Sequence, residues 1–248
     1  MLGLKIYENP RFVGQPRMLA ALPDMGNVAG IGIQFLAKKL NAKLFAEIFS
    51  YWPPYVTYNN GIIDYLQASY KFYSVADYNI VIFTGDFNPT DPRRLYEICY
   101  EVLKMAEMVN AKMLYSIGAT LQQVTSSSVT KKVVYGVVNR PEILDVLKKY
   151  DIVTMQGEGQ ITGFNGLILG LAKERGMDAI CILGEIDNPN MIQPKTAEAV
   201  LQVLIKILGI SSMNMLELEE EEKRKKFMEE QMSYLEKVME NGEPPGIA

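Results

Sequence analysis

Short apolar segments of strand length alternate with amphipathic segments of helix length along the first 210 residues of this chain. The clearest strand covers residues 78–85, where β-branched side chains are frequent and a glycine ends the run. The clearest helix covers residues 92–109, with Asp91 as its expected N-cap and Pro92 at its first position. Such alternation is typical of βαβ units, in which helices cover both faces of a mostly parallel sheet.

We therefore predict a three-layer α/β/α domain over residues 1–210, and the same patterns predict its other elements. Strands are expected near residues 19–22, 43–48, 111–118, 133–138 and 178–185, and residues 62–72 are expected to form strands or a hairpin. Helices are expected at residues 28–40, 140–149, 165–174 and 194–208, with Gly209 as the stop of the last one.

Two glycine-rich segments precede predicted helices. Gly26, Gly30 and Gly32 have the spacing G-x-x-x-G-x-G, which differs from the dinucleotide fingerprint G-x-G-x-x-G. A helix N-terminus in such a place can hold an anion, but glycines here also let a helix pack closely on a sheet. We favour packing, and we expect Gly26, Gly30, Gly163 and Gly166 to be structural glycine turns.

Composition excludes several classes of chemistry. The chain contains no histidine, so neither Ser-His-Asp nor Cys-His catalysis nor a histidine zinc site is available. Its two cysteines, Cys99 and Cys181, lie in apolar surroundings without a C-x-x-C partner, so we interpret both as buried hydrophobic residues. No metal and no cofactor is therefore expected.

Charge and hydropathy limit the partners. The net charge of −4 gives no footprint for nucleic acid. No apolar run approaches the roughly 20 residues that a membrane-spanning helix needs. The first eight residues lack the basic-then-apolar layout of a signal peptide, so the sequence favours a cytoplasmic protein without membrane or nucleic-acid partners.

Several acidic residues follow predicted strands or lie beside glycines: Asp24, Asp86, Glu158, Glu185 and Asp187. The carboxyl ends of parallel strands line the usual ligand crevice, where converging carboxylates can do acid–base work or hold a metal. Acids in such loops are more often caps and turn formers. The sequence alone does not decide whether these side chains converge.

The chain changes character after Ser211. Residues 219–222 are all glutamate and residues 223–226 are all basic, an order that favours a helix through i,i+4 pairs. An apolar stripe with spacings of four, three and four then suits contact with another subunit or partner, and the final eight residues predict a flexible or extended tail. We expect a separate segment over 211–248, with these partner-binding residues: Phe227, Met228, Met232, Tyr234, Leu235, Met239 and Ile247.

Three segments in this order resemble one family. They are residues 26–30 (GNVAG), residues 81–89 (VIFTGDFNP), and residues 163–169 with 176–185 (GFNGLIL and GMDAICILGE). Over roughly residues 15–210 the chain resembles the archaeal branch of the proteasome assembly chaperone 2 family. The resemblance implies a fold like that of purine nucleoside phosphorylases, no catalytic residues, homo-oligomers, and a link to assembly or activation of the proteasome core particle.

Archaeal relatives can carry a C-terminal hydrophobic-Tyr-any motif that inserts into pockets on the proteasome α-ring. This chain ends in Gly246, Ile247 and Ala248, which do not match that motif. The resemblance leaves two partners besides a second copy of the chain. These are the α subunits of the proteasome core particle and another archaeal chaperone-like protein.

Two functional hypotheses follow. The first is a non-enzymatic, homo-oligomeric scaffold of the chaperone type, which acts through its C-terminal segment. The alternative is a hydrolase-like or phosphorylase-like enzyme that handles nucleosides or nucleotides, with Asp86, Glu158 and Glu185 as its acids. This alternative rests on analogy at the level of the fold.

Overall fold

The computed structural model describes residues 2–50, 56–65, 68–121 and 132–240, with side chains of the last helix described up to Glu229. Within these ranges, one nine-stranded sheet has the order β1-β3-β6-β7-β2-β8-β11-β9-β10. Its strands are β1 (Leu2–Ile6), β2 (Arg17–Ala20), β3 (Lys43–Ser50), β6 (Ala68–Val75), β7 (Ile80–Gly85), β8 (Met113–Leu121), β9 (Val134–Val138), β10 (Val153–Thr154) and β11 (Ala179–Ile186).

The centre of the sheet is parallel. Strands β7, β2, β8 and β11 are neighbours that run in one direction, while β6 and β9 pair antiparallel at either side of them. The outer strand β3 runs with the central four, and β1 and β10 run against them. Parallel pairing in the middle requires helical crossovers, which matches the alternation of the sequence.

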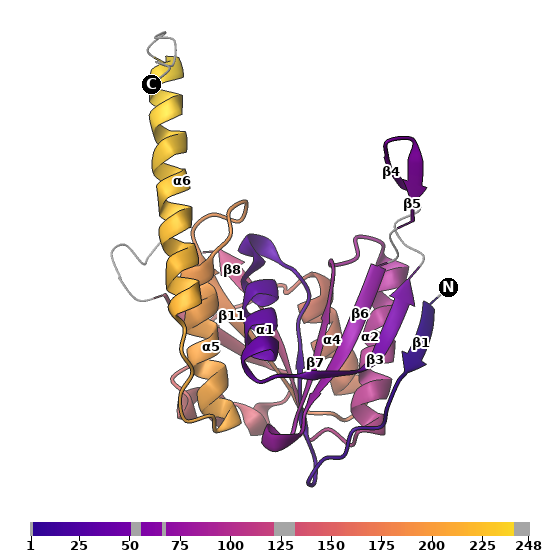
Figure 1. Ribbon diagram of the computed structural model, residues 1–248. Coiled ribbons are helices and arrows are strands. Elements are labelled where there is room, and N and C mark those ends of the chain that lie inside the picture. Colours follow the sequence, from indigo (N-terminus) through magenta and orange to yellow (C-terminus); the bar gives the residue numbers. More distant parts are fainter. Residues whose placement is uncertain (1, 51–55, 66–67, 122–131, 241–248) are drawn as a thin grey trace.

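Helices cover both faces of the sheet (Figure 1). On one face lie α1 (Val28–Lys39), the short α3 (Asp145–Lys149) and α5 (Pro194–Leu208), which share an aliphatic core with the sheet. On the other face lie α2 (Pro92–Met108) and α4 (Gly163–Glu174), whose core contains a run of aromatic rings. Phe83 stands at its centre, 4.9 Å from Phe72 and 5.7 Å from Phe164 between ring centroids. The predicted three-layer α/β/α fold is confirmed.

Local signals placed most helix ends. Asp91 caps α2, because its side chain accepts a hydrogen bond from the backbone N–H of Arg94 at 3.0 Å. Gly209 ends α5 with φ of +73°, a left-handed conformation that suits glycine. The helix predicted at 140–149 is shorter: Pro141, which has no N–H, starts a 3₁₀ turn at Pro141–Ile143, and α3 begins only at Asp145.

Two elements extend beyond the body of the molecule (Figure 1). One is a hairpin of β4 (Thr57–Asn59) and β5 (Ile62–Asp64), which is inserted between β3 and β6. Asn60 and Gly61 form its turn with positive φ at both positions, the backbone that a two-residue hairpin turn requires. The other is the C-terminal helix α6 (Leu216–Glu240).

Candidate functional site

The root of α6 packs against the body of the protein. Leu218 is buried and joins the aliphatic core shared by α1 and α5. One residue earlier, Glu217 binds Lys38 at 2.9 Å and Lys39 at 2.7 Å, both in the last turn of α1. Hydrogen bonds from Lys39 and then Lys38 lower the pKa of Glu217 to about 2. These pairs are solvent-exposed, so the buried leucine contributes more to the docking than the ion pairs do.

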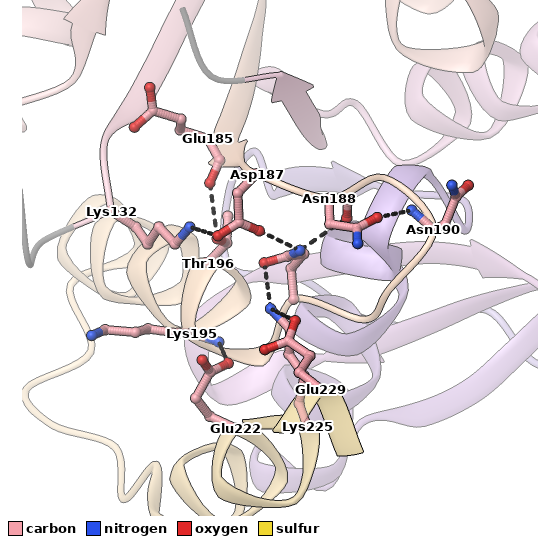
Figure 2. A network of polar contacts seen from close by, with 11 residues as sticks. Lys132, Glu185, Asp187, Asn188, Asn190, Lys195, Thr196, Glu222, Lys225 and Glu229 are labelled. Carbon is pink, nitrogen blue, oxygen red and sulfur yellow. Dashed lines mark hydrogen bonds and ion pairs between the residues drawn. The ribbon is translucent and has the colours of Figure 1, made fainter. Parts of the chain in front are cut away.

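Two turns further along α6, a lysine is buried. Lys225 has only 4% of its surface exposed, and its ammonium donates a hydrogen bond to Gln193 Oε1 at 3.0 Å (Figure 2). Glu229, one turn on, lies 3.6 Å from the same ammonium. The Glu222 carboxylate accepts a hydrogen bond from the backbone N–H of Lys195 in the first turn of α5. Side chains therefore fix the root of α6 on the start of α5.

Gln193 connects this root to the loop between β11 and α5. Its Nε2 donates to Asp187 Oδ1 at 2.8 Å and to the backbone carbonyl of Asn188 at 2.9 Å (Figure 2). Lys132 pairs with the same Asp187 carboxylate at 3.0 Å. Burial alone would raise the pKa of Asp187, but hydrogen bonds from Lys132 and Gln193 hold it at about 2. Asp187 is thus an ionised structural anchor.

Beyond its root, α6 carries exposed apolar side chains. Phe227 is 62% exposed and Met228 is 51% exposed. Four further residues proposed for partner binding lie on the part of α6 where only the backbone is described: Met232, Tyr234, Leu235 and Met239. Ile247, also proposed for partner binding, lies outside the described residues. The burial of Lys225 was not predicted from the charged run. Its spacing of seven residues from Leu218 is the signal that places both on one helix face.

The acids of the enzymatic hypothesis lie apart. Asp86 follows β7 and is exposed, and its side chain accepts a hydrogen bond from the backbone N–H of Ser69. Glu185 is buried in β11. Partial burial of Tyr135 itself, and then the charge of Glu185, raise the pKa of Tyr135. Since β2 and β8 separate β7 from β11, the two strand ends are roughly 14 Å apart. Glu158 is exposed in the loop before α4.

A crevice of about 400 Å³ opens at the carboxyl ends of the central strands. Among the described residues, Asp24 is the acid that lines it; Asp86, Glu158 and Glu185 do not. Asp24 Oδ1 accepts a hydrogen bond from the backbone N–H of Ala29 at 2.9 Å. Burial raises the pKa of Asp24 to about 7, because backbone N–H groups compensate only part of the lost hydration.

The four glycines singled out from the sequence occupy crowded or left-handed positions. Gly26 and Gly163 have φ of +63° and +68°. A Cβ on Gly30 would meet the Asn27 side chain, and a Cβ on Gly166 would collide with the carbonyl oxygen of Ile161. A larger residue would therefore strain the backbone at Gly26 and Gly163, collide with backbone at Gly166 and displace the Asn27 side chain at Gly30.

Both cysteines are free and fully buried, as predicted. Burial raises the pKa of Cys99 and of Cys181 to about 12, which suppresses the reactive thiolate. Within the described ranges, no cluster of three His, Cys, Asp or Glu side chains is arranged to hold a metal ion. None of the helices in this part of the chain has the length and hydropathy to cross a bilayer.

Comparison with known proteins identifies the family. The sequence model of the PAC2 family matches residues 18–233. The chain belongs to the PAC2 family. The match continues beyond the core and includes α6 up to residue 233.

Individual relatives share both sequence and fold. The uncharacterized protein MJ1210 of Methanocaldococcus jannaschii is 29% identical over 224 residues, which are 89% of this chain and 82% of that protein. The crystal structure of Pyrococcus furiosus PbaB, described as an archaeal proteasome activator, has a TM-score of 0.78 at 26% identity, covering 95% of this chain and 98% of PbaB. Pyrococcus furiosus PbaA, an archaeal homolog of proteasome-assembly chaperone, has a TM-score of 0.73 at 25% identity, covering 96% of this chain and 97% of PbaA.

Proposed function

We propose that this protein is a non-enzymatic, homo-oligomeric factor of the proteasome-assembly-chaperone type. Membership of the PAC2 family and likeness to PbaA and PbaB support a chaperone-like role. In this proposal, the α/β core of residues 1–210 self-associates and the segment 211–248 contacts the partner. The partner is the α-ring of an archaeal proteasome core particle, or another archaeal chaperone-like protein.

The observation that carries the proposal is the construction of α6. Its root is fixed by the buried side chains of Leu218 and Lys225, while the helix continues away from the body (Figure 1). Phe227 and Met228 are exposed directly after this root. A helix held firmly at one end and apolar beyond it is suited to reach a partner, and methionine adapts easily to an uneven surface.

Co-sedimentation with an archaeal proteasome core particle tests the contact. We compare the full chain with a version that ends at Glu229, which keeps the root of α6 intact. A double variant, Phe227→Ser with Met228→Ser, removes the exposed apolar pair. Leu216→Ser is the matched control, because Leu216 is an equally exposed apolar residue (58%) at the start of the same helix.

We expect binding by the full chain and by Leu216→Ser, loss of binding on truncation, and binding weakened about tenfold by the double variant. Equal binding by the full and truncated chains would contradict a role for the arm. A chain that assembles but ignores the core particle would direct the search to the other chaperone-like partner. Sedimentation velocity tests self-association separately, and a monomer would refute that part of the proposal.

A further inference from the structure

The crevice at the carboxyl ends of the central strands lies at a switch point of the sheet. From β2 the chain runs through α1, over one face of the sheet, to β3, and from β7 it crosses through α2, over the other face, to β8. The connections that leave the neighbouring strands β2 and β7 therefore lie on opposite faces of the sheet. Crevices of this origin are where open α/β sheets bind small molecules.

Three residues that line this crevice each carry a buried side-chain oxygen atom without a hydrogen-bond partner among the described residues. These atoms are Asp24 Oδ2, Asn88 Oδ1 and Asn165 Oδ1, which belong to three separate segments: the loop after β2, the loop after β7 and the first turn of α4. Of the eight such side-chain atoms in the described part of the chain, three belong to residues that line this one crevice. Buried acceptors without partners are unfavourable, and their gathering in one place indicates a ligand that brings donors.

The remaining lining defines what such a ligand looks like. Apolar side chains, among them Met155, Ile161 and Leu183, form part of the wall. Hydroxyl groups come from Thr120 and Thr162. Among the described residues no lysine or arginine lines the crevice, so this described lining offers no cationic side chain to a strongly anionic molecule.

We infer that this crevice binds a small uncharged or cationic molecule that carries several hydroxyl or amino donors on an apolar ring or chain. Its donors bind Asp24 Oδ2, Asn88 Oδ1 and Asn165 Oδ1, and its apolar part packs on Met155, Ile161 and Leu183. The volume of about 400 Å³ suits a molecule of nucleoside size. This binding needs no catalytic acid and does not depend on α6.

Ligand-observed NMR on the full chain tests the inference, with adenosine, ribose and agmatine as probes at millimolar concentration. The critical variant is Asp24→Asn. It keeps the shape of the side chain, but it puts an NH₂ group in place of one carboxylate oxygen and removes the negative charge. Asp86→Asn is the matched control, because Asp86 is a strand-end acid outside the crevice. Far-UV circular dichroism verifies that both variants are folded.

We expect at least one probe to bind the wild-type chain and Asp86→Asn equally, and to bind Asp24→Asn about 5- to 100-fold more weakly. For agmatine, affinity should rise with pH as Asp24 ionises near pH 7, and this rise should be absent in Asp24→Asn. Absence of binding by all three probes would overturn the inference and leave water as the occupant. Binding that Asp24→Asn does not change would place the ligand elsewhere and would also overturn it.

Discussion

Replacing Lys225 by methionine tests whether the buried lysine holds the root of α6. Methionine keeps most of the apolar stem and removes the ammonium, so the Gln193 Oε1 that it contacts at 3.0 Å loses its donor. A buried acceptor left without a partner costs about 1–3 kcal/mol. The pair with Glu229 adds little, because that carboxylate is 39% exposed and lies 3.6 Å away.

An opposing contribution favours the variant. The buried ammonium of Lys225 gives up its hydration on folding, and methionine has no such cost. We expect the cost of the unpartnered Gln193 oxygen to exceed this gain in hydration. Lys132 still holds Asp187, and Asp187 still accepts a hydrogen bond from Gln193, so the Gln193 side chain stays in place after the lysine is gone. The net local destabilisation should be about 1–2 kcal/mol, which raises the opening equilibrium of the root by roughly 5- to 30-fold.

Hydrogen exchange measured by mass spectrometry detects this opening in peptides that cover residues 187–193 and 216–229. Lys223→Met is the control, because Lys223 is exposed on the same stretch of α6 and loses the same charge. Faster exchange in Lys225→Met alone supports the argument. Equal exchange in the two variants would show that the lysine contributes no net stability to the root. Slower exchange in Lys225→Met would show that burying the ammonium destabilises the root. Either result would refute the argument.

Three further predictions concern the core. Between about pH 4 and 7 the native state keeps a proton on Asp24 that the unfolded state releases, so the contribution of Asp24 to the free energy of unfolding falls as pH rises. In urea unfolding, the stability of Asp24→Asn relative to wild type should therefore increase by up to about 3 kcal/mol between pH 5 and 8. A difference in stability that does not change with pH would refute the raised pKa of Asp24. Gly166→Ala should lose about 3 kcal/mol or more because its Cβ meets a backbone oxygen, whereas Gly170→Ala, with nothing within 4 Å, should gain about 0.5–1 kcal/mol in thermal unfolding. Cys99 and Cys181 should resist a thiol reagent in the native state and react after unfolding; rapid native labelling of either would contradict their burial.

Local signals in the sequence were sufficient for most of the fold. The β-branched run of β7 and the Asp91-Pro92 start of α2 predict those elements because the responsible interactions lie within a few residues. The hairpin β4–β5 was not singled out, although Asn60-Gly61 is a strong signal for a two-residue turn. Strand order has no such local signal, since it depends on contacts between distant segments.

The candidate site depends on that strand order. Asp86 and Glu185 both follow or end apolar strands, yet β2 and β8 lie between them, so the two acids cannot share a pocket. Asp24 has the same sequence character, but its loop faces the crevice. The burial of Lys225 likewise depends on Gln193, which is 32 residues away in the sequence. Sequence patterns supply such residues as candidates, and tertiary contacts select among them.

The glycine segment illustrates how one motif can serve several neighbours. Gly26 exchanges backbone hydrogen bonds with the loop that holds the root of α6, donating to Pro189 and accepting from Gln193. A Cβ on Gly26 would lie 2.6 Å from Gln193 Cγ, on Gly30 it would meet Asn27, and on Gly32 it would lie 3.8 Å from Leu201 of α5. Each glycine is therefore explained by a different contact. Gly26 also places the loop that lines the crevice directly against the loop that anchors α6, so the two sites share one backbone connection.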